Sequence, residues 1–330
     1  MGGDRLRIVL IGYGARGREW HQACRRRRDL VLVGAIDPDV SARAAAERAG
    51  LRAWPTLEGA IGSGGADRAI VASPPAGHVE QALDCLELGL PVLVEKPLAL
   101  AIADAARLAA ASDRLGLPVL VGQNFRFLPR ERAVRKGLVA LGPPLGASIV
   151  SARPASAAAP HLAGIEHGAV WDICLHHLDA LRVRFGSTPQ TVAMSVREVG
   201  GVEPRQRYRI ELEWPGAVGV IYEHSEGAPG FFHAEWIEGA RCAIVVRDQK
   251  ASILFDGRRP RPVSVPRGPL PEQALLDALL GATGAEASAL GVADNLATIA
   301  MVEAAVRSVE LGQPVEPTAV AGRAGVEIDV

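Results

Sequence analysis

Two separate stretches of the chain carry side chains that could exchange protons with a substrate. Lys96 follows the apolar run Pro91–Val94, which places it just beyond the carboxyl end of a predicted parallel strand, the edge where α/β sheets bind ligands. Asp172, His176 and Asp179 are four and three residues apart, so they share one face of a predicted helix. An ammonium, an imidazole and carboxylates are the groups that general acid–base catalysis uses.

Spacing alone leaves three interpretations of this helical trio open. The imidazole could be a hydrogen-bonded core histidine, or the three groups could be ligands of a zinc ion. In the third interpretation, a carboxylate fixes the tautomer of a histidine that exchanges protons with the substrate. Lys96 has an alternative of its own, an exposed ion pair with Glu95. The choice among these interpretations depends on the other motifs of the chain.

A glycine-rich turn near the amino terminus indicates a dinucleotide-binding site. The apolar run Leu6–Ile11 leads directly into Gly12-Tyr13-Gly14-Ala15-Arg16-Gly17, and a second apolar run ends about 20 residues later at Asp37. The first glycine permits the tight turn, the second lets backbone N–H groups approach a pyrophosphate, and the third lets the next helix pack closely. We expect Asp37 to accept both ribose hydroxyls of an adenosine. This favours NAD over NADP, because a 2′-phosphate would lie against the carboxylate.

The first part of the chain alternates short β-rich runs with alanine-rich helical stretches, the pattern of a parallel sheet with crossover helices. Most of these runs are apolar without alternation, so both faces of the sheet are expected to be covered. The predicted strands are Leu6–Ile11, Leu30–Ile36, Arg68–Ser73, Pro91–Val94 and Pro118–Val121. The helices predicted between them are Ala15–Arg28, Val40–Ala49, Ala76–Leu88 and Ile102–Leu115.

The pattern changes after residue 121. Several later segments alternate apolar and polar residues, as half-buried antiparallel strands do. In one of them Tyr208, Ile210, Leu212 and Trp214 face the same side. Such a sheet leaves one face open unless a second subunit covers it, which predicts a homo-oligomer. Two long helices are predicted beside this sheet, Ala169–Phe185 and Val292–Leu311.

Composition narrows the class of protein. A length of 330 residues predicts about two domains. A net charge of −1 gives no electrostatic reason to expect nucleic acid or a membrane as partner. The amino-terminal residues lack the apolar core of a signal peptide, and no apolar run is long enough to span a membrane, so we expect a cytoplasmic protein. Dispersed cysteines favour buried thiols over disulfides or zinc ligands: Cys24, Cys85, Cys174 and Cys242.

With these motifs together, the chain resembles the Gfo/Idh/MocA oxidoreductases. The resemblance covers nearly the whole sequence and rests on the glycine loop, Ser73-Pro74-Pro75 with His78, Gly89–Pro97 with its Glu-Lys-Pro ending, Arg126-Phe127, Gly168–Asp179 and Ala305–Gly312. It implies an α/β fold, with a Rossmann dinucleotide-binding domain over residues 1–121. An α/β domain over residues 122–330 would follow, with a large, mostly antiparallel open-faced sheet that often makes dimers or tetramers.

The resemblance also implies a site. Lys96, Asp172 and His176 would surround the reacting carbon, with the nicotinamide in the cleft between the domains. The residues expected to bind the cofactor are Gly12, Tyr13, Gly14, Ala15, Arg16, Gly17, Asp37, Ser73, Pro74, His78, Glu95 and Lys96. Those expected to bind substrate are Lys96, Arg126, Arg153, His161, His167, Asp172, His176 and His177, with His233 as a further candidate. A pocket with several hydrogen-bonding cations suits a polyol, a sugar or a sugar acid, and no metal is expected.

Two positions depart from the family pattern. His167-Gly168 stands where family members often have Gly-Gly, and His177 stands where many carry Asp or a small polar residue. Neither departure removes a catalytic group. Because these side chains would line the substrate pocket, they affect which substrate is bound.

The expected reaction is oxidation of a secondary alcohol. His176, oriented by Asp172, would remove the hydroxyl proton while Lys96 stabilises the developing negative charge, and the roles of Lys96 and His176 could be exchanged. The alternative is a dinucleotide-binding regulator without turnover, since fold does not fix function. A binding-only protein has no need for the three proton-handling groups, which favours the enzyme.

Overall fold

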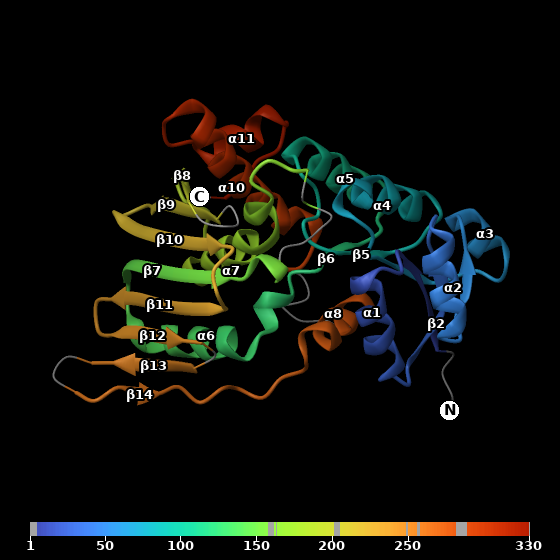
Figure 1. The fold of residues 1–330 in the computed structure, drawn as a ribbon, viewed down its shortest axis with the longest axis horizontal. Helices are drawn as coiled ribbons and strands as arrows, with labels where there is room; N and C mark the ends of the chain where they lie inside the picture. The colour runs from blue at the N-terminus through green and yellow to red at the C-terminus, as the bar shows by residue number, and fades with distance from the viewer. Residues whose placement is uncertain are drawn as a thin grey trace. The chain divides into compact units, whose positions relative to one another are not determined.

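The computed structural model describes residues 5–157, 162, 164–200, 205–248, 250–255, 258–281 and 289–329. The chain forms two compact units (Figure 1). Unit 1 comprises Met1–Asn124 and Pro269–Leu296, and unit 2 comprises Phe125–Gly268 and Ala297–Val330. The sequence predicts a single division at residue 121, which does not include this return of the chain to unit 1. No local sequence pattern marks the return. Among the residues described, no helix has the length and apolar character needed to cross a membrane.

Unit 1 is built on a six-stranded sheet with the order β3-β2-β1-β4-β5-β6. All neighbouring strands are parallel. The strand order reverses between β1 and β4, which is the switch point where doubly wound sheets bind ligands. Every residue of β5 and β6 is buried, as predicted for a sheet covered on both faces. The strands are β1 Leu6–Ile11, β2 Leu30–Ile36, β3 Arg52–Trp54, β4 Arg68–Val71, β5 Val92–Val94 and β6 Val119–Val121.

The helices of unit 1 follow the predicted crossover pattern with shifted ends. The predicted helix over Ala76–Leu88 begins instead with a 3-10 turn, η1 Pro75–Gly77. The sequence pattern predicts neither β3 nor α3, because three and six residues are too short to show a period. The α-helices are α1 Ala15–Arg25, α2 Val40–Arg48, α3 Leu57–Gly62, α4 His78–Glu87, α5 Ile102–Leu115 and α8 Pro271–Leu279, together with the start of α10 Val292–Leu311.

Unit 2 contains an eight-stranded sheet with the order β14-β13-β12-β11-β7-β10-β9-β8. The pair β7 and β10 is parallel, and the other neighbours are antiparallel. The four residues predicted to share the inner face of β9 are all buried. These features confirm the predicted fold class. The strands are β7 Pro144–Arg153, β8 Thr191–Val199, β9 Arg205–Trp214, β10 Val218–Glu226, β11 Phe232–Gly239, β12 Ala243–Arg247, β13 Lys250–Leu254 and β14 Arg261–Pro262.

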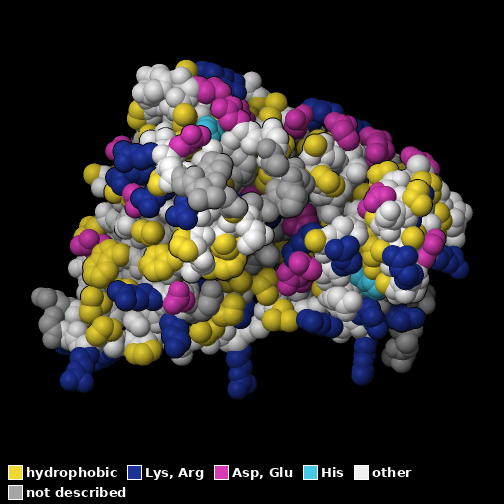
Figure 2. Space-filling model, viewed as in Figure 1, with side chains coloured by type: hydrophobic (Ala, Val, Ile, Leu, Met, Phe, Trp, Pro, Cys, Tyr) yellow, Lys and Arg dark blue, Asp and Glu magenta, His cyan; other side chains and the backbone are white. Residues whose placement is uncertain are grey.

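One face of this sheet is covered by helices. Residues of α6 share a hydrophobic cluster with β11, β12 and β13, and the backbone N–H of Met194 on β8 donates to the hydroxyl of Ser308 on α10 at 2.7 Å. The opposite face is open: Figure 2 shows hydrophobic side chains gathered over β7, β10 and β11, where Val150, Phe232 and Trp236 are exposed. The helices are α6 Pro129–Leu141, α7 Leu175–Phe185, the part of α10 from Ala297 on, and α11 Pro317–Arg323, with short turns η2 Asn124–Phe127, η3 Ala155–Ala157 and η5 Val170–Cys174.

Candidate active site

The glycine loop between β1 and α1 adopts the tight turn that its sequence predicts. Gly12 has a φ of +90°, a left-handed value that glycine adopts readily, and its N–H donates to the carbonyl of Ile36 at 2.8 Å. A Cβ atom at Gly17 would lie 2.1 Å from the carbonyl oxygen of Gly12, so α1 packs directly on the loop. Beyond the immediate chain neighbours, no described atom lies within 4 Å of the position of a Cβ at Gly14. The amino end of α1 is therefore open to an anion.

Asp37 is fixed beside this loop. Its Oδ2 atom accepts a hydrogen bond from the N–H of Tyr13 at 2.8 Å, and its Oδ1 atom accepts one from the N–H of Asp39 at 2.9 Å. The Arg43 guanidinium donates to the carbonyls of Asp37 and Pro38, each at 2.8 Å. The carboxylate stands where an adenosine ribose lies in dinucleotide sites. The loop and this carboxylate together fit NAD.

Glu95 joins the glycine loop to the lysine turn. Its buried carboxylate follows β5, and the Oε1 atom accepts from Arg16 Nε at 2.6 Å and from Trp20 Nε1 at 2.8 Å. Arg16 also forms an ion pair with Glu272 of α8. Because Lys96 is the next residue, the turn that bears the ammonium is held against the first turn of α1. The side chains of Arg16 and Glu95, expected to bind cofactor, thus engage each other.

His78 opens α4 and is buried. Its Nδ1 atom lies 2.8 Å from the carbonyl oxygen of Pro97, and its Nε2 atom lies 2.8 Å from that of Ser73. The Ser73 hydroxyl is 2.6 Å from the side-chain oxygen of Gln81, while Pro74 directly precedes the 3-10 turn η1. Both ring nitrogens of the histidine therefore contact the backbone segments that follow β4 and β5.

In unit 2, the helix that carries the predicted acid–base groups begins with the π-helical turn η5 and continues as α7. π-helical turns are rare in proteins, and those that occur often lie at functional sites. Asp172 lies in this turn, where its Oδ2 atom accepts from Arg153 Nη1 at 2.6 Å. Arg153 also donates from Nε to Glu226 at 2.8 Å. Because both Asp172 and Arg153 are buried, each offsets the other's charge in the interior.

His176 is buried on α7 with its ring plane set by an aromatic neighbour. The imidazole stacks on Phe125 with ring centroids 4.0 Å apart and planes 6° from parallel. The guanidinium carbon of Arg130 lies 5.1 Å from the centroid of the same phenyl ring. This packing restricts the ring of His176 to one orientation, which a proton-transfer group requires.

Asp179, the third member of the predicted trio, is engaged differently. Its carboxylate accepts from Arg126 Nε at 2.7 Å and from the hydroxyl of Thr298 on α10 at 2.8 Å. Burial alone would raise the pKa of Asp179, but Arg126, Arg182 and the Thr298 hydroxyl together outweigh it and hold that pKa below its ordinary value. Arg126 and Arg153, both expected to contact substrate, therefore each have a buried carboxylate partner within unit 2.

A buried polar cluster on α7 extends beyond the residues that sequence analysis singled out. The ring of His177 stacks on His233 at 5.1 Å between centroids, and His233 Nε2 lies 2.5 Å from Glu235. Glu235 pairs with Arg184 at 2.6 Å, and Arg184 also pairs with Glu131 at 2.7 Å. Burial lowers the pKa of His177 well below its ordinary value, and His233 adds to this effect, so the ring is neutral at physiological pH.

Only one sequence signal could have revealed part of this cluster: His233 and Glu235 are two residues apart, so they face the same side of β11. The other partners come from α6 and α7 and meet only in the fold. His161 lies outside the described residues. His167 has a φ of +53° and meets the edge of the Tyr208 ring at 6.0 Å. Within the described ranges, no group of three or more His, Cys, Asp or Glu is placed to hold a metal ion.

The amino-terminal region of the chain matches a known protein family. Residues 6–123 match GFO_IDH_MocA, described as an oxidoreductase family with an NAD-binding Rossmann fold. This region is thus similar to the Rossmann domain of that family. The parallel sheet, the glycine loop and Asp37 of unit 1 are the parts of this Rossmann domain that a dinucleotide requires.

Curated relatives match part of the chain. The D-apiose dehydrogenase of Paraburkholderia graminis is 30% identical over 199 residues, which cover 58% of this chain and 53% of the relative. The inositol 2-dehydrogenase of Corynebacterium glutamicum is 34% identical over 135 residues, which cover 40% of each protein. The chain therefore spans about half the length of these relatives or less.

A solved structure matches over a greater length. An oxidoreductase from Agrobacterium radiobacter, in complex with NAD+, L-tartaric acid and magnesium, has a TM-score of 0.81 at 19% identity. The match covers 96% of this chain and 99% of that one. At this identity it shows a shared fold that extends beyond the Rossmann domain.

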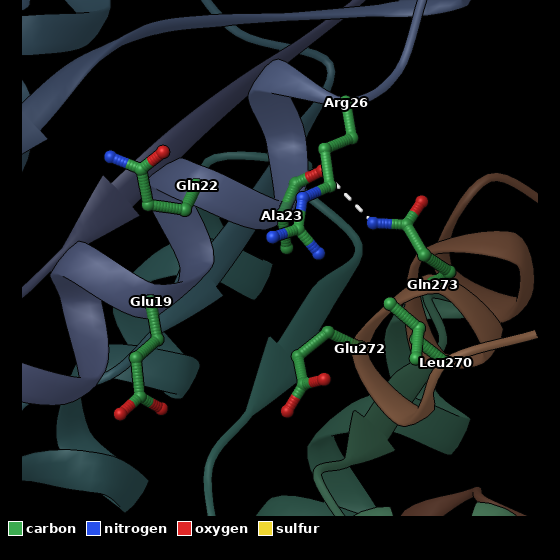
Figure 3. Close-up of a pocket in the computed structure, with 7 residues that line it drawn as sticks. All are labelled: Glu19, Gln22, Ala23, Arg26, Leu270, Glu272 and Gln273. Carbon is green, nitrogen blue, oxygen red and sulfur yellow. Dashed lines mark hydrogen bonds between the residues drawn. The ribbon is translucent and has the colours of Figure 1, made fainter.

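A surface groove on unit 1 is lined by no residue of the glycine loop, although Arg16 of that loop pairs with two of its lining residues, Glu19 and Glu272. It lies between α1 and α8, has a volume of about 270 Å³, and is bordered by the hydrogen bond from Gln273 to the carbonyl of Ala23 at 3.0 Å (Figure 3). Its lining comes from the middle and the carboxyl end of α1, whereas the loop lies at the amino end. We therefore do not assign it to the cofactor. The lining residues are Glu19, Gln22, Ala23, Arg26, Leu270, Glu272 and Gln273.

Proposed function

We propose that the chain is an NAD-dependent dehydrogenase that oxidises a secondary alcohol of a sugar, polyol or related small molecule. The observation that carries the proposal is the ion pair of Arg16 with Glu95 at 2.6 Å. It fastens the turn bearing Lys96 to the loop that would receive the pyrophosphate, so a lysine stands on the cofactor-binding edge of a Rossmann sheet. A regulator that only bound a dinucleotide would have no use for an ammonium there.

The proposed chemistry divides hydride and proton transfer. When bound, NAD supplies the hydride acceptor. His176 removes the hydroxyl proton as its stacking on Phe125 holds the ring in one plane. Asp172 is the carboxylate proposed to orient His176, and Arg153 holds it in place at 2.6 Å. The Lys96 ammonium stabilises the substrate oxygen as negative charge develops.

The substrate class is inferred from relatives and side chains together. Relatives of this chain are named for D-apiose and for inositol, and polyhydroxylated compounds need several hydrogen-bonding partners. His167 and His177 remain our candidates for contacts with substrate hydroxyls. Arg126 and Arg153, whose guanidinium groups are paired with carboxylates, are proposed to shape the site by holding Asp179 and Asp172.

Coenzyme preference is proposed to depend on Asp37. Its two carboxylate oxygens are held by backbone N–H groups of Tyr13 and Asp39, so the negative charge cannot swing away from an incoming 2′-phosphate. Arg43, the guanidinium beside it, is engaged with backbone carbonyls. We therefore propose NAD as the coenzyme.

A substrate screen tests this function. We expect one or more polyols, sugars or sugar acids to reduce NAD, and to reduce NADP more slowly, when the reduced coenzyme is followed by absorbance. The double variant Lys96→Met with His176→Asn serves as the control without turnover. Binding of NADH with no oxidation of any compound would favour the non-catalytic regulator, and tighter binding of NADPH than NADH would contradict the role of Asp37.

We also propose that a second copy of the chain covers the open face of the unit 2 sheet, giving a homodimer or, by further pairing, a tetramer. Val150, Phe232 and Trp236 are exposed there, and contiguous exposed apolar surface marks interaction sites.

The four cysteines are free and buried, which fits the reducing cytoplasm that we propose as the location.

Trp236→Glu tests the assembly, because an unpaired carboxylate in a buried interface costs several kcal/mol. We expect light scattering to give a multiple of 34.6 kDa for the native protein and the single-chain mass for the variant. Val139→Glu is the matched control: Val139 is 84% exposed on α6 and lies off the sheet. A native protein that is monomeric at working concentration would refute the proposal.

A further inference from the structure

We propose that His78 is a positioning residue for Lys96. The inference rests on the proposed function only in taking Lys96 as a reacting group. The contacts of His78 with Ser73 and Pro97 lie within unit 1. The family resemblance predicts a cofactor-binding role for this side chain.

The geometry is that of a clamp across two neighbouring strands. The carbonyl of Ser73 follows β4 and the carbonyl of Pro97 follows β5, and these strands pair in parallel. The imidazole bridges the two carbonyl oxygens at 2.8 Å on each side. The residue His78 is 1% exposed, so water does not compete for either contact.

The two contacts of the clamp require a side chain that donates hydrogen bonds to carbonyl oxygens. A carbonyl oxygen only accepts hydrogen bonds, so each ring nitrogen must donate for its contact to be satisfied. A neutral imidazole carries one N–H and an imidazolium carries two, so the imidazolium satisfies both carbonyls. A side chain without N–H groups would leave at least one more of these carbonyls unpaired than the imidazole does, which costs free energy.

The position of Pro97 makes Lys96 the residue that responds. Glu95 is held from the α1 side by Arg16 and Trp20, and His78 holds Pro97 from the α4 side. The lysine lies between these two attachments. Loss of the His78 attachment frees the far side of the turn, while the glycine loop and Asp37 keep their own contacts.

Activity of the full-length chain provides the first test. We expect His78→Leu to lower kcat by roughly 10- to 100-fold, because a displacement of about 1 Å at a reacting group has an effect of this size. The KM for NAD and the Kd for NADH should change little. His78→Gln, whose amide donates from one nitrogen, should recover part of the loss. Ser112→Ala is the control, since Ser112 also donates to a backbone carbonyl, that of Leu117 at 2.7 Å, in the segment before β6.

A second measurement does not depend on catalysis. The lysines of the chain are Lys96, Lys136 and Lys250, so reductive methylation with a ¹³C label gives a simple NMR spectrum in which Lys96→Arg identifies one signal. In His78→Leu the Lys96 signal should shift or broaden, while those of Lys136 and Lys250 stay in place. An unchanged Lys96 signal would overturn the clamp. A shifted signal with native kcat in both His78→Leu and Lys96→Met would support the clamp and reject the catalytic role of Lys96.

Discussion

Replacement of His176 by Asn is expected to lower kcat by about 10²- to 10⁴-fold, the usual contribution of a positioned acid–base group. Asparagine keeps a polar side chain of similar reach but cannot take up a proton at neutral pH. Binding of NADH should survive, because the glycine loop and Asp37 belong to unit 1. Steady-state kinetics with the substrate found in the screen, together with a fluorescence titration of NADH, separates the two effects.

A matched control keeps this result interpretable. Ser308→Ala removes a buried hydrogen bond of unit 2, the one that its hydroxyl accepts from the N–H of Met194 at 2.7 Å, without touching α7. We expect that variant to lose stability and retain kcat. A His176→Asn enzyme with native turnover would contradict the assignment. If instead the decisive loss fell on Lys96→Met alone, the two residues would exchange roles as principal acid–base group.

The second large effect is on stability. Arg184→Met should destabilise the protein by about 3–5 kcal/mol at neutral pH, because removing one partner of a buried ion pair leaves uncompensated charge. The Arg184 side chain is 2% exposed and pairs with Glu131 and Glu235, whose side chains are 3% and 0% exposed. Urea unfolding followed by circular dichroism measures the change.

The pH dependence of this loss has a definite sign. Burial alone would raise the pKa of Glu235, but Arg184 and His233 outweigh it, so the native pKa lies below its ordinary value. In the native protein this contribution is therefore present at neutral pH and lost as the pH falls. Without Arg184, burial meets less opposition, so the pKa of Glu235 should rise. The difference between variant and native protein should then shrink as the pH falls.

A compensated variant completes the experiment. Adding Glu131→Gln and Glu235→Gln to Arg184→Met removes the two charges that the single variant leaves unpaired, so part of the lost stability should return. Equal stability of Arg184→Met and the native protein at neutral pH would show that the ion-pair cluster contributes nothing.

Much of the architecture could be predicted because it depends on local patterns. Alternation along β9 predicts which of its residues are buried, and the spacing from the glycine loop to Asp37 predicts a carboxylate beside the loop, as the structure shows. Partners distant in the sequence could not be predicted. Nothing near Arg153 or Arg126 in the sequence indicates that each meets a carboxylate of the η5–α7 helix. The family resemblance therefore predicts both as substrate contacts.

The helix of the predicted trio shows another limit. A regular α-helix places Asp172, His176 and Asp179 on one face, but the π-helical turn at Val170–Cys174 changes the rotation per residue before α7 begins. In the structure, Asp172 forms an ion pair with Arg153, and Asp179 forms one with Arg126. The shared catalytic role of Lys96, Asp172 and His176 stays a prediction, which the variants above test.

The late return of the chain to unit 1 affects how the protein is made. Among the described residues, Leu290 and Gly291 lie against the outer side of strand β6, through the hydrogen bond of Val121 N–H to the Leu290 carbonyl at 2.8 Å and the bridge of Leu120 to Gly291. On the ribosome, that border of the sheet stays uncovered while residues 125–268 are synthesised. An uncovered strand border is a template for pairing with other chains, so nascent molecules are most vulnerable to misassembly during this interval.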